Sequence, residues 1–176
     1  MKTARILALL LALAMTAVVL TPSSGSAAAS SKVVSFKGSY SGTATVLIDN
    51  SAVTIQSVKG TGSASVVGAG SLSGTGNGTG SSGQCVPFTG PGTIKGAKGT
   101  IKFTVNPAKS QGCSSGQSGP VSVTVNGVAK VTSGTGKAKG AKGNLTFKGT
   151  LKLNDTTGSQ SGAFSGSVSG KLTVTK

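Results

Sequence analysis

The sequence predicts an all-β fold, an antiparallel barrel of about eight strands, with a β-sandwich as the alternative. Two observations lead to this prediction. Valine, isoleucine, leucine and phenylalanine alternate with threonine, serine and lysine along much of the chain, as half-buried strands require. In addition, FKGSYSGTATV at residues 36–46 is similar to FSGSVSGKLTV at residues 164–174. If these related end strands pair with each other, the sheet closes and leaves no exposed edge.

Residues 1–29 have the features of a secretory signal peptide. Two positive residues precede an apolar run at 6–20, and small residues at 27–29 fit a cleavage site. The run is short for a membrane span, which needs about 20 residues. We therefore expect residues 30–176 to form one exported, soluble domain without a transmembrane segment. An uncleaved N-terminal anchor is the alternative.

The first strand is predicted over residues 36–48, where apolar and small residues share one face and serine, threonine and lysine the other. Residues 49–50 form a turn, and a second strand begins at residues 53–55. The stretch 59–84 is rich in glycine and poor in bulky residues. Its last part, residues 73–83, has the composition of a mobile loop.

In the second half of the chain the strongest hairpin signal is Asn126-Gly127, because it follows alternating valines and both residues tolerate positive φ. Asn154-Asp155 predicts another turn. Further strands are predicted at residues 100–105, 121–125, 145–153 and 164–174.

Glycine recurs at inward-facing positions of these strands. A strand that bends sharply, or passes close to another backbone, has no room for a side chain there. The alternative explanation is that these glycines only reflect the low-complexity composition of the chain and have no structural role. The positions are Gly38, Gly42, Gly149, Gly166 and Gly170.

Cys85 and Cys113 are the only cysteines, and in an exported protein they predict a disulfide. In the chain-entropy model such a bond stabilises the fold by about 3–4 kcal/mol. A zinc or redox site is disfavoured, because two ligands do not complete a metal site and the chain has no C-x-x-C motif.

The composition excludes most enzyme chemistry. After residue 29 the chain has no histidine, glutamate or arginine, and its only carboxylates are Asp49 and Asp155. Acid–base and metal-assisted catalysis both depend on such groups. A serine–lysine pair and a calcium site at the aspartates are alternatives with little support. We therefore predict no catalytic residue, no metal and no cofactor, and we disfavour an enzyme.

Lysine accounts for nearly all of the charged side chains after residue 29. Its clusters predict electrostatic docking onto an anionic cell-wall polymer or polysaccharide, membrane head groups or extracellular nucleic acid. A solvated strand face is an equally weighted alternative. Sequence-specific nucleic-acid binding is not expected, because arginine is absent after residue 29 and aromatic residues are few. The candidate anion-binding residues are Lys95, Lys98, Lys102, Lys137, Lys139, Lys142 and Lys148.

Residues 90–103 and 134–147 share the pattern G-x-G-x-x-x-G-A-K-G-x-[IL]-x-F. The second copy resembles the G-G-T-G-x-F-x-G-A-x-G-x-x-x-F signature of secreted bacterial β-barrel proteins and of the allene oxide cyclase and dirigent superfamily. This resemblance implies an eight-stranded antiparallel barrel, often a homo-oligomer, with the glycines in a tight strand–turn–strand near the rim. Lys137 and Ala138 depart from the signature. The acidic, arginine or aromatic pocket residues of the superfamily's enzymes are scarce here, so the resemblance implies no activity.

Three functions remain open. The preferred one is a secreted, non-enzymatic barrel that binds an anionic surface or polymer through its lysines. The alternative is a barrel with an apolar cavity that binds, or isomerises, a small hydrophobic molecule. A cavity of several hundred Å³ lined by phenylalanine and leucine would favour the latter. The third is a structural or adhesive exoprotein without a small ligand.

Overall fold

The computed structural model describes residues 30–49, 52–79 and 84–176. The predicted signal peptide, Asn50 of the first predicted turn, and residues 80–83 lie outside the described residues. Within the described ranges, no helix has the length and apolar character that a membrane crossing requires.

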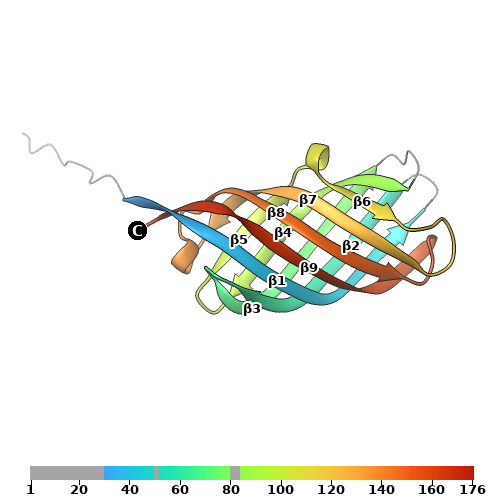
Figure 1. Cartoon of the computed structure of the whole chain (residues 1–176), viewed down its shortest axis with the longest axis horizontal. Helices are drawn as coiled ribbons and strands as arrows, with labels where there is room; N and C mark the ends of the chain where they lie inside the picture. The colour runs from blue at the N-terminus through green and yellow to red at the C-terminus, as the bar shows by residue number, and fades with distance from the viewer. Residues whose placement is uncertain (1–29, 50–51, 80–83) are drawn as a thin grey trace, which may run out of the picture.

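The described residues form strands joined by short connections (Figure 1). The strands are β1 (Ser31–Ile48), β2 (Ala52–Ala64), β3 (Gly68–Thr79), β4 (Cys85–Gly96), β5 (Gly99–Val105), β6 (Gln111–Ser114), β7 (Val121–Gly134), β8 (Lys142–Leu153) and β9 (Gly158–Thr175). Single 3-10 turns, η1 (Pro107–Lys109) and η2 (Gly136–Ala138), follow β5 and β7.

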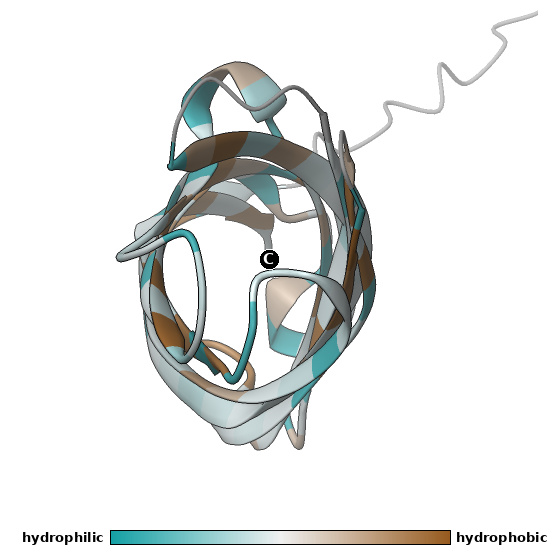
Figure 2. Cartoon of the chain, turned by 90° about the vertical axis from the view of Figure 1, so that its right-hand side faces the viewer, coloured by the Kyte–Doolittle hydropathy of each residue, from teal (hydrophilic) through white to brown (hydrophobic). Residues whose placement is uncertain are grey.

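The strands close into an eight-stranded antiparallel barrel, which confirms the predicted fold class and excludes the sandwich. The first and last strands pair along their whole length, from Ser31 opposite Thr175 to Ile48 opposite Gly158. Pairing of β3 with β4 completes the ring. The strands therefore have no continuous unpaired edge, as the similarity between residues 36–46 and 164–174 predicted. Figure 2 looks along this ring from the end opposite the C-terminus.

One of the eight strand positions is divided between β5 and β6. Both strands lie between β4 and β7, and η1 bulges out between them. Ser110 bridges this interruption, because its hydroxyl accepts a hydrogen bond from the Val128 amide at 3.1 Å and lies 3.4 Å from the Val128 carbonyl oxygen. The buried Ser110 side chain thus satisfies backbone groups that a continuous strand would have satisfied.

The predicted hairpin at Asn126-Gly127 is wrong, because both residues lie inside the continuous strand β7. The absence of a side chain at Gly127 makes room for neighbouring side chains and does not serve a turn of the chain. A Cβ atom at this position would overlap the ring of Phe147 and lie 2.6 Å from the Ser110 hydroxyl oxygen. Local turn propensity is overridden here by pairing with strands on both sides of β7.

The predicted loop over residues 73–83 is also wrong for residues 73–79, which belong to β3. Glycine is common in this strand because its backbone lies close to that of β4. A Cβ on Gly70 would overlap the carbonyl oxygen of Lys95, and one on Gly76 would overlap that of Thr89. Pairing with β2 and β4 therefore stabilises a segment whose composition alone favours a loop.

The predicted close approach of the neighbouring backbone is confirmed at two of the inward-facing glycines, Gly42 and Gly170. A Cβ on Gly42 would overlap the carbonyl oxygen of Lys59, and one on Gly170 would overlap that of Asn144. Adjacent strands thus come too near for any side chain at these positions.

The C-terminus marks one end of the barrel (Figure 1). Buried side chains fill this end, and we call it the packed end. Residues from the connections close it: Val67 after β2, and Ala138 and Ala141 between β7 and β8, are all buried. The largest fully buried side chains are Phe36, Val67, Ile94, Ile101, Leu145, Leu172 and Val174.

The two copies of the repeated motif both lie at the packed end, but their turns differ. In residues 90–103, Ala97 and Lys98 form a two-residue turn between β4 and β5. In residues 134–147, a longer connection carries η2, and Ala141 is buried under the barrel. The two similar sequences therefore form a two-residue hairpin turn in the first copy, and in the second copy a longer connection whose buried alanines close the packed end.

Candidate functional site

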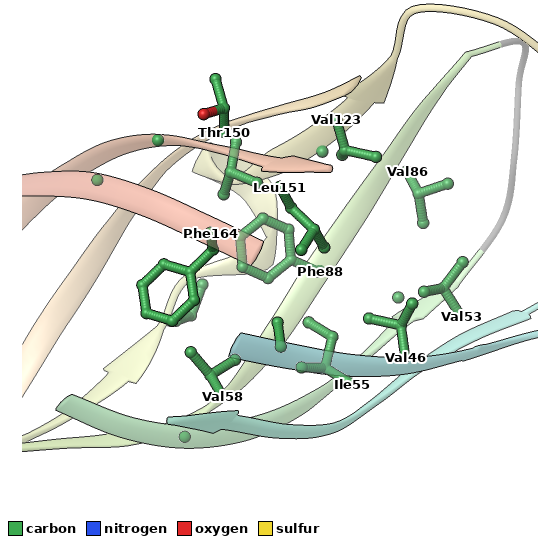
Figure 3. A pocket seen from close by; sticks show the side chains of 18 of the residues that line it. Val46, Val53, Ile55, Val58, Val86, Phe88, Val123, Thr150, Leu151 and Phe164 are labelled. Carbon is green, nitrogen blue, oxygen red and sulfur yellow. The ribbon is translucent and has the colours of Figure 1, made fainter. Parts of the chain in front are cut away.

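The half of the barrel away from the packed end encloses a cavity of about 870 Å³. Side chains from strands all around the barrel point into it, as Figure 3 shows for Val46, Ile55, Leu151 and Phe164. Ligand pockets in proteins occupy about 300–1,000 Å³, so this volume lies within their range and exceeds a packing defect.

The wall of the cavity is apolar. Its side chains are on the inward-facing positions of their strands, and many are only half-buried because they border the cavity. The apolar wall residues include Val46, Val53, Ile55, Val58, Leu72, Val86, Phe88, Phe103, Val123, Val125, Phe147, Leu151, Phe164 and Val168. The outward-facing positions, by contrast, carry mostly serine, threonine and lysine.

Pairs of glycine and phenylalanine explain part of the hollow. Phe103 lies opposite Gly92, and Phe147 lies opposite Gly127 on the neighbouring strand. Each ring occupies the space where the glycine would carry a side chain. Rings placed over the wall leave the centre of the barrel open, and they cover backbone that glycine alone would expose.

The mouth of the cavity, which we call the open end, has a polar rim. The Thr156 hydroxyl donates a 2.7 Å hydrogen bond to the Gln117 carbonyl and so ties the β8–β9 turn to the segment that precedes β7. Asp155 accepts a hydrogen bond from the Thr156 amide in this predicted turn. Asp49 accepts one from the Ala52 amide across the β1–β2 turn. Both carboxylates of the chain therefore act as turn formers at the open end.

Tyr40 lies at the floor of the cavity, where the open half meets the packed end. It is 3 % exposed and belongs to the packed cluster, yet it also contributes to the cavity lining. Its hydroxyl is the one buried side-chain polar atom without a hydrogen-bond partner among the described residues. Burial raises the pKa of the Tyr40 phenol above its ordinary value, because the charged form is poorly solvated there.

The predicted disulfide between Cys85 and Cys113 is confirmed. The two residues lie directly opposite each other on β4 and β6, near the open end. Their neighbours Val86 and Gly112 contribute to the cavity lining, so the alternation of side chains places the sulfurs on the outside. The bond therefore holds the short strand β6 against the wall without entering the cavity.

The structure brings together six of the seven candidate anion-binding lysines. Lys98 is in the β4–β5 turn, Lys95 and Lys102 are on the strands beside it, and all three are exposed. The amide of Lys137 donates a 2.8 Å hydrogen bond to the Lys98 carbonyl, which joins the two lysine-bearing connections at the packed end. Lys139 is on the same connection as Lys137, and Lys142 is the first residue of β8. Lys148 is separate, because it lies midway along β8, opposite Asn126 and Ser167.

The cavity residues were not predicted as a site. Their signal was present in the inward-facing valines and glycines, but the sequence does not show whether side chains from opposite walls meet. Among the described residues no group of three histidine, cysteine, aspartate or glutamate side chains could hold a metal. Among the described residues, the composition and the geometry together leave an apolar cavity, one buried hydroxyl without a hydrogen-bond partner and a basic end as the main chemical features.

Comparison with known proteins found no matching family model, no matching curated protein and no matching solved structure.

Proposed function

We propose that this chain is an exported, non-enzymatic binding protein whose barrel holds a small hydrophobic molecule. The observation that carries this proposal is the apolar cavity of about 870 Å³, which opens between polar turns at one end. Transfer of apolar ligand surface from water into such a cavity is favourable by about 25 cal/mol per Å². The chain contains no histidine and no glutamate, so the geometry supports binding more than turnover.

Filling the cavity tests this proposal. Val123 points into the cavity from β7, and its neighbour Thr124 is exposed on the outer face. We expect the purified protein to bind the uncharged dye N-phenyl-1-naphthylamine with an increase in dye fluorescence. Val123→Trp should weaken binding by at least about tenfold, equivalent to about 1.4 kcal/mol. Thr124→Trp adds the same bulk outside and should bind like the unsubstituted chain.

Melting curves of all three proteins serve as the folding control. Failure of the unsubstituted chain to bind this dye and a series of uncharged apolar probes of graded size would overturn the proposal. Equal binding by Val123→Trp and Thr124→Trp, with folding intact, would place the dye outside the cavity and have the same consequence.

A second function is supported by the distribution of charge. Lysines gather on the turns and strand ends of the packed end, whereas Asp49 and Asp155 lie at the open end. We propose that the packed end docks onto an anionic polysaccharide and leaves the cavity mouth facing away. Attraction of several lysines to a polyanion is long-ranged at low salt and is screened at physiological ionic strength.

Two variants of equal charge distinguish this docking from a general effect of basicity. Lys98, Lys137 and Lys139 are at the packed end, whereas Lys109, Lys148 and Lys152 are elsewhere. The first triple substitution to glutamine should elute from an anionic polysaccharide resin at markedly lower salt than the second. Equal elution of the two variants, or retention that is insensitive to salt, would reject docking through this end.

The same proposal places the protein outside the cytoplasm. The signal-like leader and the Cys85–Cys113 disulfide both fit an oxidising compartment. The protein recovered from the culture medium of an expressing host should begin near Ser30. Intact protein that stays with the cells and retains Met1 would contradict this prediction.

A further inference from the structure

We propose that the Tyr40 hydroxyl is the polar anchor of the cavity: it donates a hydrogen bond to one oxygen of an otherwise apolar, uncharged ligand. The ligand class is therefore a hydrophobic molecule with a carbonyl or hydroxyl oxygen at its buried end. This inference rests on the proposed function, and it goes further by naming the chemistry of the ligand and the direction in which it enters.

The Tyr40 hydroxyl lacks a hydrogen-bond partner among the described residues. It is buried, and no described residue accepts or donates a hydrogen bond to it. Most buried polar groups in proteins are hydrogen-bonded, because a buried donor has lost its water and gains nothing if it stays unpaired. An oxygen delivered by a ligand would restore the missing bond.

Its position is suited to this role. On the inward face of β1, Phe36 lies deeper in the packed end and Ala44 lies nearer the mouth, with Tyr40 between them. Gly62 opposite leaves room for the tyrosine ring, since a Cβ there would lie 2.8 Å from the ring. Tyr40 itself contributes to the cavity lining, so a ligand in the cavity lies against this residue.

The surroundings also decide the charge of the ligand. Every lysine of the described ranges is exposed, and the carboxylates Asp49 and Asp155 are in the turns of the open end. A ligand carboxylate at the floor would be buried without a cation to pair with. A phenol is protonated at neutral pH, and burial raises the pKa of Tyr40 further, so its hydroxyl offers a donor. A neutral accepting oxygen is the complement of this site.

A matched pair of ligands tests the anchor. Acetylnaphthalene and isopropylnaphthalene have nearly the same shape, but only the first carries an accepting oxygen. Their affinities are measured by displacement of N-phenyl-1-naphthylamine. The unsubstituted protein should prefer the ketone by about three- to tenfold, the usual net effect of one hydrogen bond. Tyr40→Phe should abolish the preference, because it removes only the hydrogen bond to the ketone.

A second measurement needs no variant. Tyr40 is the only tyrosine, so the ¹³Cζ NMR resonance of protein labelled with ¹³C-tyrosine reports this residue alone. Binding of the ketone should shift this resonance, as a new hydrogen bond from the phenol would, and the hydrocarbon should shift it much less.

The outcomes separate the two proposals. If neither ligand binds, the proposed function itself fails. If both bind without preference, or if Tyr40→Phe weakens both equally, the cavity is a binding site but the anchor is wrong. An unchanged tyrosine ¹³Cζ resonance with bound ketone would also overturn the anchor.

Discussion

The packed end and the open end of the barrel are built from the same strands, yet one is filled and the other hollow. On β1, Phe36 fills the packed end, whereas Ala44 faces inward nearer the mouth. On β9, Leu172 is buried at the packed end, whereas Gly166 borders the cavity. Alternation of inward and outward residues thus builds the wall at both ends, but it does not decide whether side chains from opposite walls meet and fill the interior.

The connections reinforce this difference. At the packed end, Val67, Ala138 and Ala141 insert apolar side chains under the strands. At the open end the contact between connections is polar, from the Thr156 hydroxyl to the Gln117 carbonyl. Small apolar plugs exclude water from one end, while hydrogen-bonded turns frame the other and leave it accessible.

The largest effect should come from emptying the packed end. Phe36→Ala removes a fully buried ring and should lower the free energy of unfolding by about 3–5 kcal/mol. Val123→Ala on the cavity wall removes half-buried methyl groups that already border open space, and should cost about 1 kcal/mol. Denaturant titrations of both variants measure the difference. Equal losses would show that the open half is as tightly packed as the other in solution.

The next effect concerns the disulfide at the open end. Replacement of Cys85 and Cys113 by serine removes a link across 28 positions of sequence and should lower the free energy of unfolding by about 3–4 kcal/mol in the chain-entropy model. Hydrogen exchange of the double variant should speed up mainly in β6 and the start of β4. Faster exchange spread evenly to β1 and β9 would argue against a local role at the mouth.

A smaller effect should follow from adding one methyl group beneath a ring. Gly127→Ala forces Phe147 and Ser110 to move and should cost about 1–3 kcal/mol. Gly116→Ala is the control, because the nearest atom, in Val121, would lie at an ordinary 3.5 Å, and its effect should stay within about 0.5 kcal/mol. Thermal unfolding of the two variants compares them directly. Tolerance of alanine at both positions would mean that the wall is more adaptable than the structure indicates.

The smallest effect is the pH dependence contributed by Tyr40. Its pKa is higher in the folded chain than in the unfolded chain, so the folded state holds this proton more tightly. The corresponding stability is complete below the unfolded pKa of about 10 and is lost as pH rises through the folded pKa. The unsubstituted protein should therefore lose more stability than Tyr40→Phe as the pH rises above about 10. Parallel losses would show that the phenol is solvated.

Much of the fold could be predicted because alternation is a local property. The strand over residues 36–48, the turn at Asp155, the disulfide and the pairing of the end strands were all readable from nearby residues or from sequence similarity. Predictions failed where distant pairing overrode local composition. Gly127 tolerates a turn, but the space it leaves for Phe147 and its pairing on both sides hold it in a strand.

The candidate site was less predictable than the fold. Six lysines of the predicted anion-binding set do gather at the packed end, since the repeated motifs carry them to neighbouring turns. The cavity residues come from strands spread over the whole chain, and no spacing in the sequence marks them as a group. Tyr40 was assigned only to the inner face of a strand, because a missing hydrogen-bond partner is a property of the surroundings.

By itself, the sequence determined an all-strand wall with a basic, hydroxyl-rich outside, because a period of two assigns each residue to one side of a sheet. Only the tertiary structure decided that one half of the barrel is hollow and that a lone hydroxyl lies at its floor. The physical reason is that the empty space depends on distances between opposite walls, and these are set by closure of the whole ring.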